Sequence, residues 1–396
     1  MPSTPSGNRS YRFQWSADLM TSSAFEMENV ILAWFIAVQT GSVLLVVVFG
    51  SLQYLGTLVA PVLGLAGDHV GHRLVMVGMR LAFVLLAALL AVLVLLDALT
   101  PAAVLVVAGI AGLIRPSDIS LRTVLIGETV PEARLMGAIS LSRITMDGAR
   151  LGGALAGAGV VAVLGMGRAY AAIVLLYLAG AALTLGVARQ PPRPRSAARS
   201  PLHDLLVAAR AVWQAPPQLA AMVLAFAVNL TAYPFTLGLL PFIAREVYGT
   251  TQEGLGTLVA ATGAGSIAAS LLLGVVGTPA RPGRTMLVWS VVWHGLLILF
   301  GQLGTMTAGL VLLPLIGAAQ MMCLLPVSVL LVRGAPPELR GRIMGMRTLA
   351  IYGLPIGLLC AGPLIDHLGF PGTAWLYGLL GSAATLVVGI AWRAHL

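Results

Sequence analysis

Long apolar runs are the feature that most constrains the fold of this chain. They follow one another along nearly the whole sequence, 58% of the residues are hydrophobic, and only 9% are charged. A soluble domain has about a quarter of its residues charged, so this composition cannot cover a surface that faces water. The chain is therefore predicted to be an integral membrane protein, whose partner along most of its length is the lipid bilayer.

The apolar runs predict an all-α membrane protein with twelve transmembrane helices in two six-helix bundles, because a spanning helix needs about 20 mostly apolar residues. The first run reaches this length only when it begins near Trp15, which places Glu26 and Glu28 inside the membrane. The predicted spans lie near residues 16–39, 43–65, 74–96, 101–125, 137–163, 169–188, 217–244, 254–277, 285–303, 306–332, 342–365 and 371–392.

The distribution of arginines predicts the orientation of the chain in the membrane. All 23 basic residues are Arg. With the N-terminus in the cytoplasm, the outer loops hold only Arg168 and Arg245, so the positive-inside rule predicts that both termini are cytoplasmic. The inner loops and helix ends then hold Arg9, Arg12, Arg73, Arg80, Arg134, Arg189, Arg193, Arg195, Arg199, Arg210, Arg281, Arg284, Arg333, Arg340, Arg342, Arg347 and Arg393.

A Pro- and Arg-rich stretch divides the predicted spans into two halves. We assign residues 1–14 to a cytoplasmic tail, 15–188 to an N-terminal six-helix bundle, 189–216 to a cytoplasmic linker and 217–396 to a C-terminal six-helix bundle. Within the linker, "LHDLLVAARAVW" is typical of an amphipathic helix on the inner membrane surface. A plain linker is the alternative.

The two halves repeat one another in sequence. An offset of 204 residues aligns Gly153 with Gly357 and Gly165 with Gly369, so the fifth predicted span corresponds to the eleventh. Six-helix halves related by duplication are a known transporter architecture. The repeat therefore favours a transporter.

The loop after the second predicted span contains "GLAGDHVGHR". Its residues Gly64, Asp68, Gly71 and Arg73 match in register the signature G-x-x-x-D-[RK]-x-G-[RK]-[RK] of the major facilitator superfamily. The chain resembles that superfamily along nearly its whole length. Small residues in the fifth span, Gly152, Gly153 and Gly157, resemble the drug and siderophore exporter branch.

The resemblance implies that the signature loop is a conformational latch on the cytoplasmic side, formed by Gly64, Asp68, Gly71 and Arg73. Gly71 permits a tight turn, and Asp68 can face a helix N-terminus or an Arg. His69 and His72 stand where the family usually has basic residues. Each can titrate near physiological pH, or it can be a neutral polar group of the loop.

Charged residues inside the predicted spans are candidates for a substrate cavity, because an ionisable group at membrane depth costs at least about 2.5–3.5 kcal/mol. Two consecutive spans each carry two arginines and an aspartate on one helical face, namely Arg115, Asp118 and Arg122 in the fourth and Arg143, Asp147 and Arg150 in the fifth. These faces can pair in a structural ion-pair network. Alternatively, they line the cavity and bind an anionic or zwitterionic group through the guanidinium fork.

Of the two glutamates in the first span, Glu26 is predicted to be the proton-coupling group, and Glu28 is the next candidate. Glu26 lies near the middle of the predicted span, and Glu28, two residues further, points to another side of the helix. At most one of them therefore faces a central cavity squarely. Protons are the expected coupling ion, and no metal or other cofactor is expected.

In the second half, the seventh span has a polar pair, Asn229 and Tyr233, ahead of two prolines. This pattern is typical of a discontinuous helix that lines a substrate site, with helix–helix packing as the alternative. His294 and Gln320 stand alone in apolar spans. We interpret both as buried groups with satisfied hydrogen bonds.

These patterns predict a secondary active transporter that moves a small organic molecule by alternating access. The resemblance favours proton-coupled efflux by an antiporter in a bacterial-type cytoplasmic (inner) membrane, and we expect a monomer. An importer or facilitator of a small organic anion is one alternative, and a non-transporting receptor of the same fold is another.

An enzyme is not expected, because the chain has no Lys for a P-loop or a Schiff base and no G-x-S-x-G, H-E-x-x-H or C-x-x-C motif. Arginines spread between apolar runs also argue against a nucleic-acid partner.

Overall fold

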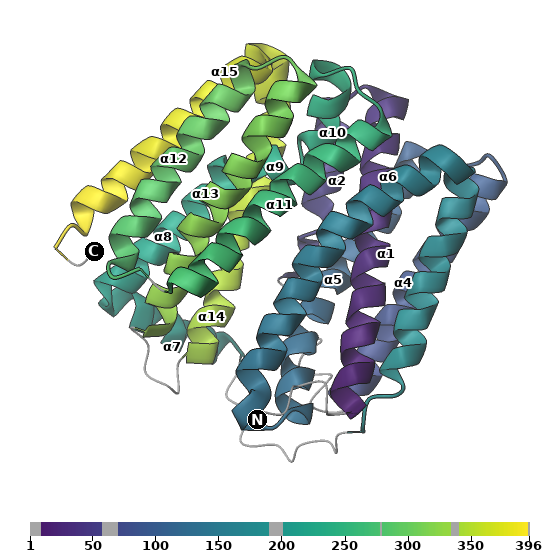
Figure 1. Cartoon of the computed structure of the whole chain (residues 1–396), viewed down its shortest axis with the longest axis horizontal. Coiled ribbons are helices and arrows are strands. Elements are labelled where there is room, and N and C mark those ends of the chain that lie inside the picture. Colours follow the sequence, from purple (N-terminus) through teal and green to yellow (C-terminus); the bar gives the residue numbers. More distant parts are fainter. Residues whose placement is uncertain (1–8, 58–69, 190–200, 278, 334–339, 395–396) are drawn as a thin grey trace. The chain divides into compact units, whose positions relative to one another are not determined.

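The computed structural model describes residues 9–57, 70–189, 201–277, 279–333 and 340–394, and within these ranges it is almost entirely helical, with no strand (Figure 1). Helices suit such an apolar chain because each satisfies its own backbone hydrogen bonds where no water is present. The predicted all-α class is therefore confirmed. Two predicted latch residues, Gly64 and Asp68, lie outside the described ranges.

The first half of the chain begins with a long helix that includes both glutamates of the first predicted span. The elements are α1 (Arg9–Thr40), α2 (Val43–Leu52), the short 3₁₀ helix η2 (Leu55–Thr57), α4 (His72–Leu95), α5 (Pro101–Thr129) and α6 (Glu132–Thr184). The local sequence explains where two of these helices, α4 and α5, begin. Gly71 has the positive φ of 96° before α4 that the predicted tight turn requires. Thr100 caps α5 by accepting a hydrogen bond from the amide of Ala103.

The second half begins with a helix in the predicted linker and then a broken span. Its elements are α7 (Pro201–Gln214), α8 (Pro216–Thr231), α9 (Tyr233–Leu237), α10 (Leu240–Phe242), the π-helical turn η3 (Ile243–Val247), α11 (Gln252–Val276), α12 (Pro282–Gln302), α13 (Met306–Arg333), α14 (Arg340–Leu349), η5 (Ala350–Tyr352) and α15 (Gly353–Ala391). The interruptions after α8 and α9 fall beside Pro234 and Pro241, which confirms the predicted discontinuity of the seventh span.

Seven helices in the described ranges are long and apolar enough to cross a membrane. Two of these, in α6 and α15, join two helical segments across a glycine with non-helical backbone angles. The helices α1 and α8 are not among the seven. The number of twelve spans and the cytoplasmic position of both termini stay predictions.

The backbone supports the internal repeat seen in the sequence. Gly165, inside α6, has φ 79° and ψ 166°, and Gly369, inside α15, has φ 72° and ψ 170°. These glycines are 204 residues apart, as the sequence alignment requires. The same unusual backbone conformation therefore joins two helical segments at equivalent places in both halves.

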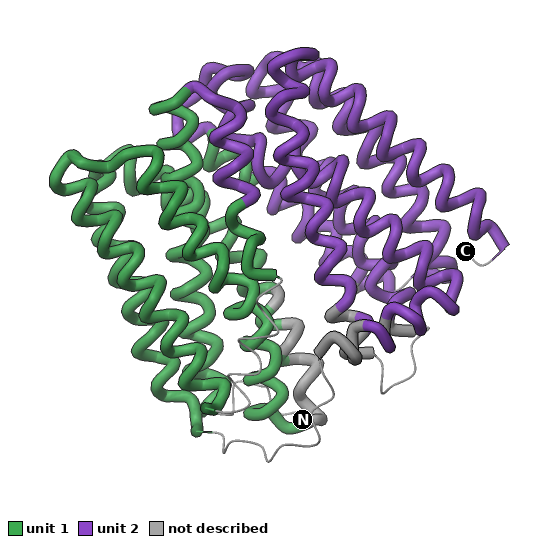
Figure 2. Tube along the Cα trace, turned by 180° about the vertical axis from the view of Figure 1, so that it is seen from behind, with its two compact units in different colours: residues 1–40, 52–197, 255–260 green, residues 41–51, 198–254, 261–396 purple. Residues whose placement is uncertain are grey.

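The chain divides into two compact units, which are coloured separately in Figure 2. Unit 1 comprises residues 1–40, 52–197 and 255–260, and unit 2 comprises residues 41–51, 198–254 and 261–396. Each unit contains most of one predicted bundle, but most of α2 belongs to unit 2, where the Ser51 hydroxyl donates a hydrogen bond of 3.4 Å to the carbonyl of Pro355. The domain boundaries drawn from the sequence stay predictions.

Glycines let α6 approach α1 closely in unit 1. A Cβ added at Gly153 would lie 2.8 Å from the Cβ of Glu26, and one added at Gly157 would lie 2.8 Å from the Cα of Met27. Unit 2 repeats this arrangement, because Gly357 lies against the backbone of Leu230 in α8. Small residues at these positions thus fix the distance between paired helices.

Gly157→Ala is expected to lower the free energy of unfolding by about 1–3 kcal/mol, the usual cost of overpacking. Gly152→Ala is the matched control, because a Cβ at Gly152 meets no heavy atom within 4 Å. Thermal unfolding of both variants in one detergent compares them. Equal transition midpoints would contradict the claim that α1 needs a glycine opposite Met27.

Candidate functional site

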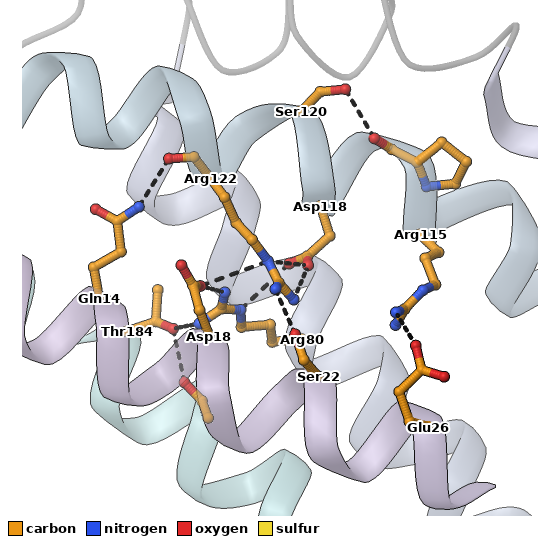
Figure 3. A network of polar contacts seen from close by, with 12 residues as sticks. Gln14, Asp18, Ser22, Glu26, Arg80, Arg115, Asp118, Ser120, Arg122 and Thr184 are labelled. Atoms are coloured by element: carbon orange, nitrogen blue, oxygen red, sulfur yellow. Dashed lines mark hydrogen bonds and ion pairs between the residues drawn. The ribbon is translucent and has the colours of Figure 1, made fainter. Parts of the chain in front are cut away.

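A polar stripe runs along one face of α1 in unit 1. Gln14, Asp18, Ser22 and Glu26 are spaced four residues apart, so they share one side of the helix. Each of them contacts an arginine of α5, as Figure 3 shows. The charged residues of the first predicted span therefore meet those of the fourth.

Two arginines and two aspartates form a buried network beside this stripe. Arg80 of α4 pairs with Asp18 and, at 3.3 Å, with Asp118 of α5. Arg122 of α5 lies 2.6 Å from Asp118 and 3.6 Å from Asp18. None of the four residues is more than 2% exposed. Their formal charges cancel, which is the condition under which buried charges are tolerated.

Neighbouring polar groups satisfy other donors and acceptors of the network (Figure 3). Arg80 donates a hydrogen bond of 2.6 Å to the Thr184 hydroxyl, and Arg122 donates one of 2.6 Å to the Ser22 hydroxyl. The Gln14 amide donates to the main-chain carbonyl of Arg122 at 2.8 Å. Such a compensated arrangement has the properties of a structural element rather than of an open binding site.

The network revises two interpretations of the sequence. We predicted that Arg80 lies in an inner loop or at a helix end. It is instead fully buried within α4. Asp118 pairs with Arg80 of α4 and with Arg122 of its own helix, so it does not show the pairing between the faces of the fourth and fifth spans that was one of the two alternatives. A contact of Asp118 with substrate stays a prediction.

One turn further along α1, a separate ion pair joins the two helices. Arg115 Nη2 lies 3.6 Å from Glu26 Oε1, and the guanidinium carbon of Arg115 lies 2.9 Å from the ring centroid of Phe25. The pair is less buried than the network, with side-chain exposures of 10% for Arg115 and 16% for Glu26. A guanidinium held over an aromatic ring keeps its donors directed at a carboxylate.

Arg150 of α6 belongs to the same neighbourhood. Tyr54 lies within electrostatic range of Arg150, Glu26 and Arg115, which places these charges around one tyrosine. Arg150 is partly exposed, and it makes no ion pair with any residue in the described part of the chain. Two of the predicted cavity arginines, Arg115 and Arg150, are therefore brought together here.

The other glutamate of α1 has a different environment. Glu28 accepts a hydrogen bond of 2.9 Å from the Tyr177 hydroxyl through Oε2. Its Oε1 atom is buried and has no hydrogen-bond partner among the described residues. The hydroxyl of Tyr170, within electrostatic range of Glu28, is also buried and has no hydrogen-bond partner in the described part of the chain. Glu28 thus has no cation at salt-bridge distance in the described structure.

The predicted residues of the second half lie in unit 2. The Gln320 amide donates a hydrogen bond of 3.1 Å to the Tyr233 hydroxyl, and the Trp293 ring meets the Tyr233 ring edge-on at 5.1 Å. Asn229 donates to the carbonyl of Ala225 in its own helix at 2.8 Å. His294 is fully buried, with hydrogen-bond partners for both ring nitrogens. The interpretation of His294 as a satisfied buried group is confirmed.

Part of the predicted latch is described. Arg73 donates a hydrogen bond of 2.7 Å to the carbonyl of Leu185, at the C-terminal end of α6, where a cation is favoured. His72 Nδ1 lies 3.0 Å from a carboxylate oxygen of Glu128 on α5. A conformational role for these contacts stays a prediction.

Some residues of these clusters were not among the predicted site residues. They are Asp18 of α1, Arg80 of α4, and Tyr177 and Thr184 of α6, in the segment that follows Gly165. The spacing of the α1 stripe was a usable signal for Asp18, whereas nothing local marks Tyr177. Arg143 and Asp147 lie in α6, and no side-chain geometry is described for Arg143. In the described ranges, no group of three or more His, Cys, Asp or Glu residues could hold a metal ion.

Comparisons with known proteins agree with the fold. The sequence model of the family described as Major Facilitator Superfamily matches residues 15–355. The POT family transporter PepTSo matches with a TM-score of 0.78 at 12% identity over 100% of both chains. The nucleoside transporter NupG gives 0.70 at 14% identity, covering 96% of this chain and 99% of that one. The human organic anion transporter MFSD10 (TETRAN) gives 0.66 at 17% identity with the same coverage. No match was found among curated proteins.

Proposed function

Because the chain belongs to the Major Facilitator Superfamily, we propose that it is a proton-coupled secondary transporter of a small organic anion or zwitterion. It is a multi-pass membrane protein with a transporter fold, not an enzyme. The substrate class and the coupling ion are parts of the proposal. The observation that supports it best is the Arg115–Glu26 pair beside the unpaired Arg150 in unit 1.

The charge balance around this pair favours an anionic substrate group. The four residues of the buried network cancel one another, and Glu26 offsets Arg115. Arg150 is left without a counter-ion in the described structure, and an uncompensated cation in a low-dielectric site attracts an anion. Its planar guanidinium suits a carboxylate or phosphate. The solved structure of an organic anion transporter among the similar folds agrees with this substrate class.

The environment of Glu28 favours a role in proton coupling. A buried carboxylate oxygen without a partner is costly when it is charged, and protonation removes that charge. Glu26, in contrast, has Arg115 to stabilise its charged form. We therefore propose Glu28 as the proton-binding group, in place of Glu26, which the sequence favoured, and Glu26 as the partner of Arg115.

Several further parts of the sequence-based prediction stand as proposals. They are export by an antiporter of the drug or siderophore type, a location in a bacterial-type inner membrane, and a monomeric state. Substrate contacts of Asn229 and Tyr233 and the latch at Gly64, Asp68, Gly71 and Arg73 belong with them. Uptake of an organic anion and a non-transporting receptor are the alternatives.

Transport by purified protein in proteoliposomes tests the proposal. A thermal-shift screen of anionic, zwitterionic and neutral metabolites first identifies a ligand, because a ligand stabilises the state that it binds. Flux of that ligand is then measured with and without a pH gradient. Substrate-dependent proton movement supports coupled transport. Binding without flux would support a receptor, and flux that ignores the gradient would contradict proton coupling.

Arg150→Gln is expected to weaken binding of an anionic ligand roughly ten- to a hundredfold, which matches the loss of a hydrogen bond to a charged group. Arg150→Lys should recover part of this affinity, because it keeps the charge but not the fork. Isothermal titration with the ligand measures both. Arg168→Gln is the control, since Arg168 is exposed and far along α6. Unchanged affinity in Arg150→Gln would remove Arg150 from the site.

A further inference from the structure

The helix α7 presents one exposed face that combines two large apolar side chains with a cation. Leu206, Arg210 and Trp213 are spaced by four and three residues, so they point to the same side of the helix. Leu206 is 60% exposed and Trp213 is 76% exposed, and Arg210 is exposed between them. Val212, on the opposite side, is only 1% exposed. One side of α7 therefore packs within unit 2, and the other side is uncovered.

The position of α7 in the chain limits what can cover this face. Only Ala215 separates the end of α7 from the start of α8, which is an apolar helix and begins the seventh predicted span. A 14-residue helix connected this closely to a membrane span cannot lie far from the membrane surface. The exposed face is then available to the headgroup region of the bilayer.

We propose that Leu206, Arg210 and Trp213 form a binding surface for anionic phospholipid headgroups. Trp prefers the boundary between headgroups and acyl chains, and a Leu on the same face can insert beside it. Between them, the Arg210 guanidinium matches a lipid phosphate in charge and geometry. A free phosphate ion would pair with the cation but would leave both apolar side chains exposed to water. A lipid satisfies all three residues at once, and this proposal does not depend on the transport site of unit 1.

A probe next to the face tests this directly in the full-length protein. Both cysteines, Cys323 and Cys360, are replaced by Ala, and Gln214→Cys places a fluorophore beside Trp213 without altering the face. The protein is reconstituted in nanodiscs of phosphatidylcholine alone or mixed with phosphatidylglycerol, each with a headgroup-level quencher on a trace lipid. We expect quenching of the fluorophore in both kinds of nanodisc. In the mixed nanodiscs, we expect stronger quenching when the labelled trace lipid is phosphatidylglycerol than when it is phosphatidylcholine.

Two variants distinguish specific binding of an anionic headgroup from the mere closeness of α7 to the bilayer. Arg210→Gln should reduce the preference for phosphatidylglycerol about fivefold, the value for one basic residue at an anionic surface, and Arg168→Gln should leave it unchanged. Trp213→Ala should lower quenching with both lipids. Absence of quenching would overturn the proposal in favour of water or a protein partner. Equal quenching by both lipids, or competition by inorganic phosphate, would overturn it as well.

Discussion

Glu28→Gln is expected to reduce substrate accumulation driven by a pH gradient to the level of empty vesicles, while substrate binding and substrate exchange persist. Gln is nearly the shape of Glu and can keep the contact with the Tyr177 hydroxyl, but it cannot take up and release a proton. Coupling requires a group that alternates between charged and neutral forms during the cycle. Gradient-driven flux and counterflow, measured in the same proteoliposome preparation, separate loss of coupling from loss of binding.

Glu26→Gln is the matched control, since it changes a carboxylate of the same helix two residues away. Because Glu26 pairs with Arg115, its loss should alter affinity for an anionic substrate and leave gradient-driven accumulation in place. Tyr177→Phe should cause an intermediate effect, because it removes the hydrogen bond to Glu28 but not the carboxylate. Full accumulation by Glu28→Gln, with loss in Glu26→Gln, would exchange the roles of the two glutamates.

Features that depend on local backbone requirements could be predicted from the sequence. The pair Gly165 and Gly369 was aligned by the repeat, and both have a positive φ that glycine tolerates best. The break of the seventh span follows likewise from Pro234 and Pro241, since proline removes a helical hydrogen bond. The helical face shared by Arg115, Asp118 and Arg122 needed only the period of a helix.

The partners of those charged residues could not be predicted in the same way. Asp118 pairs with Arg80, 38 residues away, and Arg80 pairs with Asp18, 62 residues away. Such contacts depend on how each helix is rotated about its own axis and on which helices pack together, and a single sequence contains neither directly. The assignment of Arg80 to the inner loops followed a charge rule that counts residues near helix ends but not those inside.

The two halves have similar helix arrangements, but the buried charges of α1 have no equivalents in the second half. In both, a glutamine of the first helix donates to a main-chain carbonyl, Gln14 to Arg122 and Gln218 to Leu331. The positions 204 residues after Asp18, Ser22 and Glu26, however, hold Met222, Phe226 and Leu230. Symmetry of the fold thus explains how the helices pack, whereas the buried charges of α1 occur in unit 1 without counterparts in α8.

Arg80 contacts both aspartates of the network, so its loss should destabilise unit 1 strongly. Arg80→Met is expected to lower the free energy of unfolding by about 3–5 kcal/mol, the usual cost of removing one partner of a buried ion pair. The substitution leaves Asp18 and Asp118 with a single arginine, Arg122, and none of these three residues is more than 2% exposed. Thermal unfolding in detergent, together with the fraction that elutes as a single folded species, measures the loss.

The double variant Arg80→Met with Asp18→Asn separates charge balance from packing. It restores equal numbers of positive and negative groups, so it should be more stable than Arg80→Met alone, although each change removes a native contact. Thr184→Val gives a milder test, because it removes no charge and costs only the hydrogen bond from the Arg80 guanidinium and the hydroxyl's own bond to the Gly180 carbonyl; its expected cost is about 1–3 kcal/mol. If the losses of Arg80→Met and Asp18→Asn simply add, the two residues act independently. The cancellation of charge would then not explain how a chain with so few charged residues keeps four of them buried in unit 1.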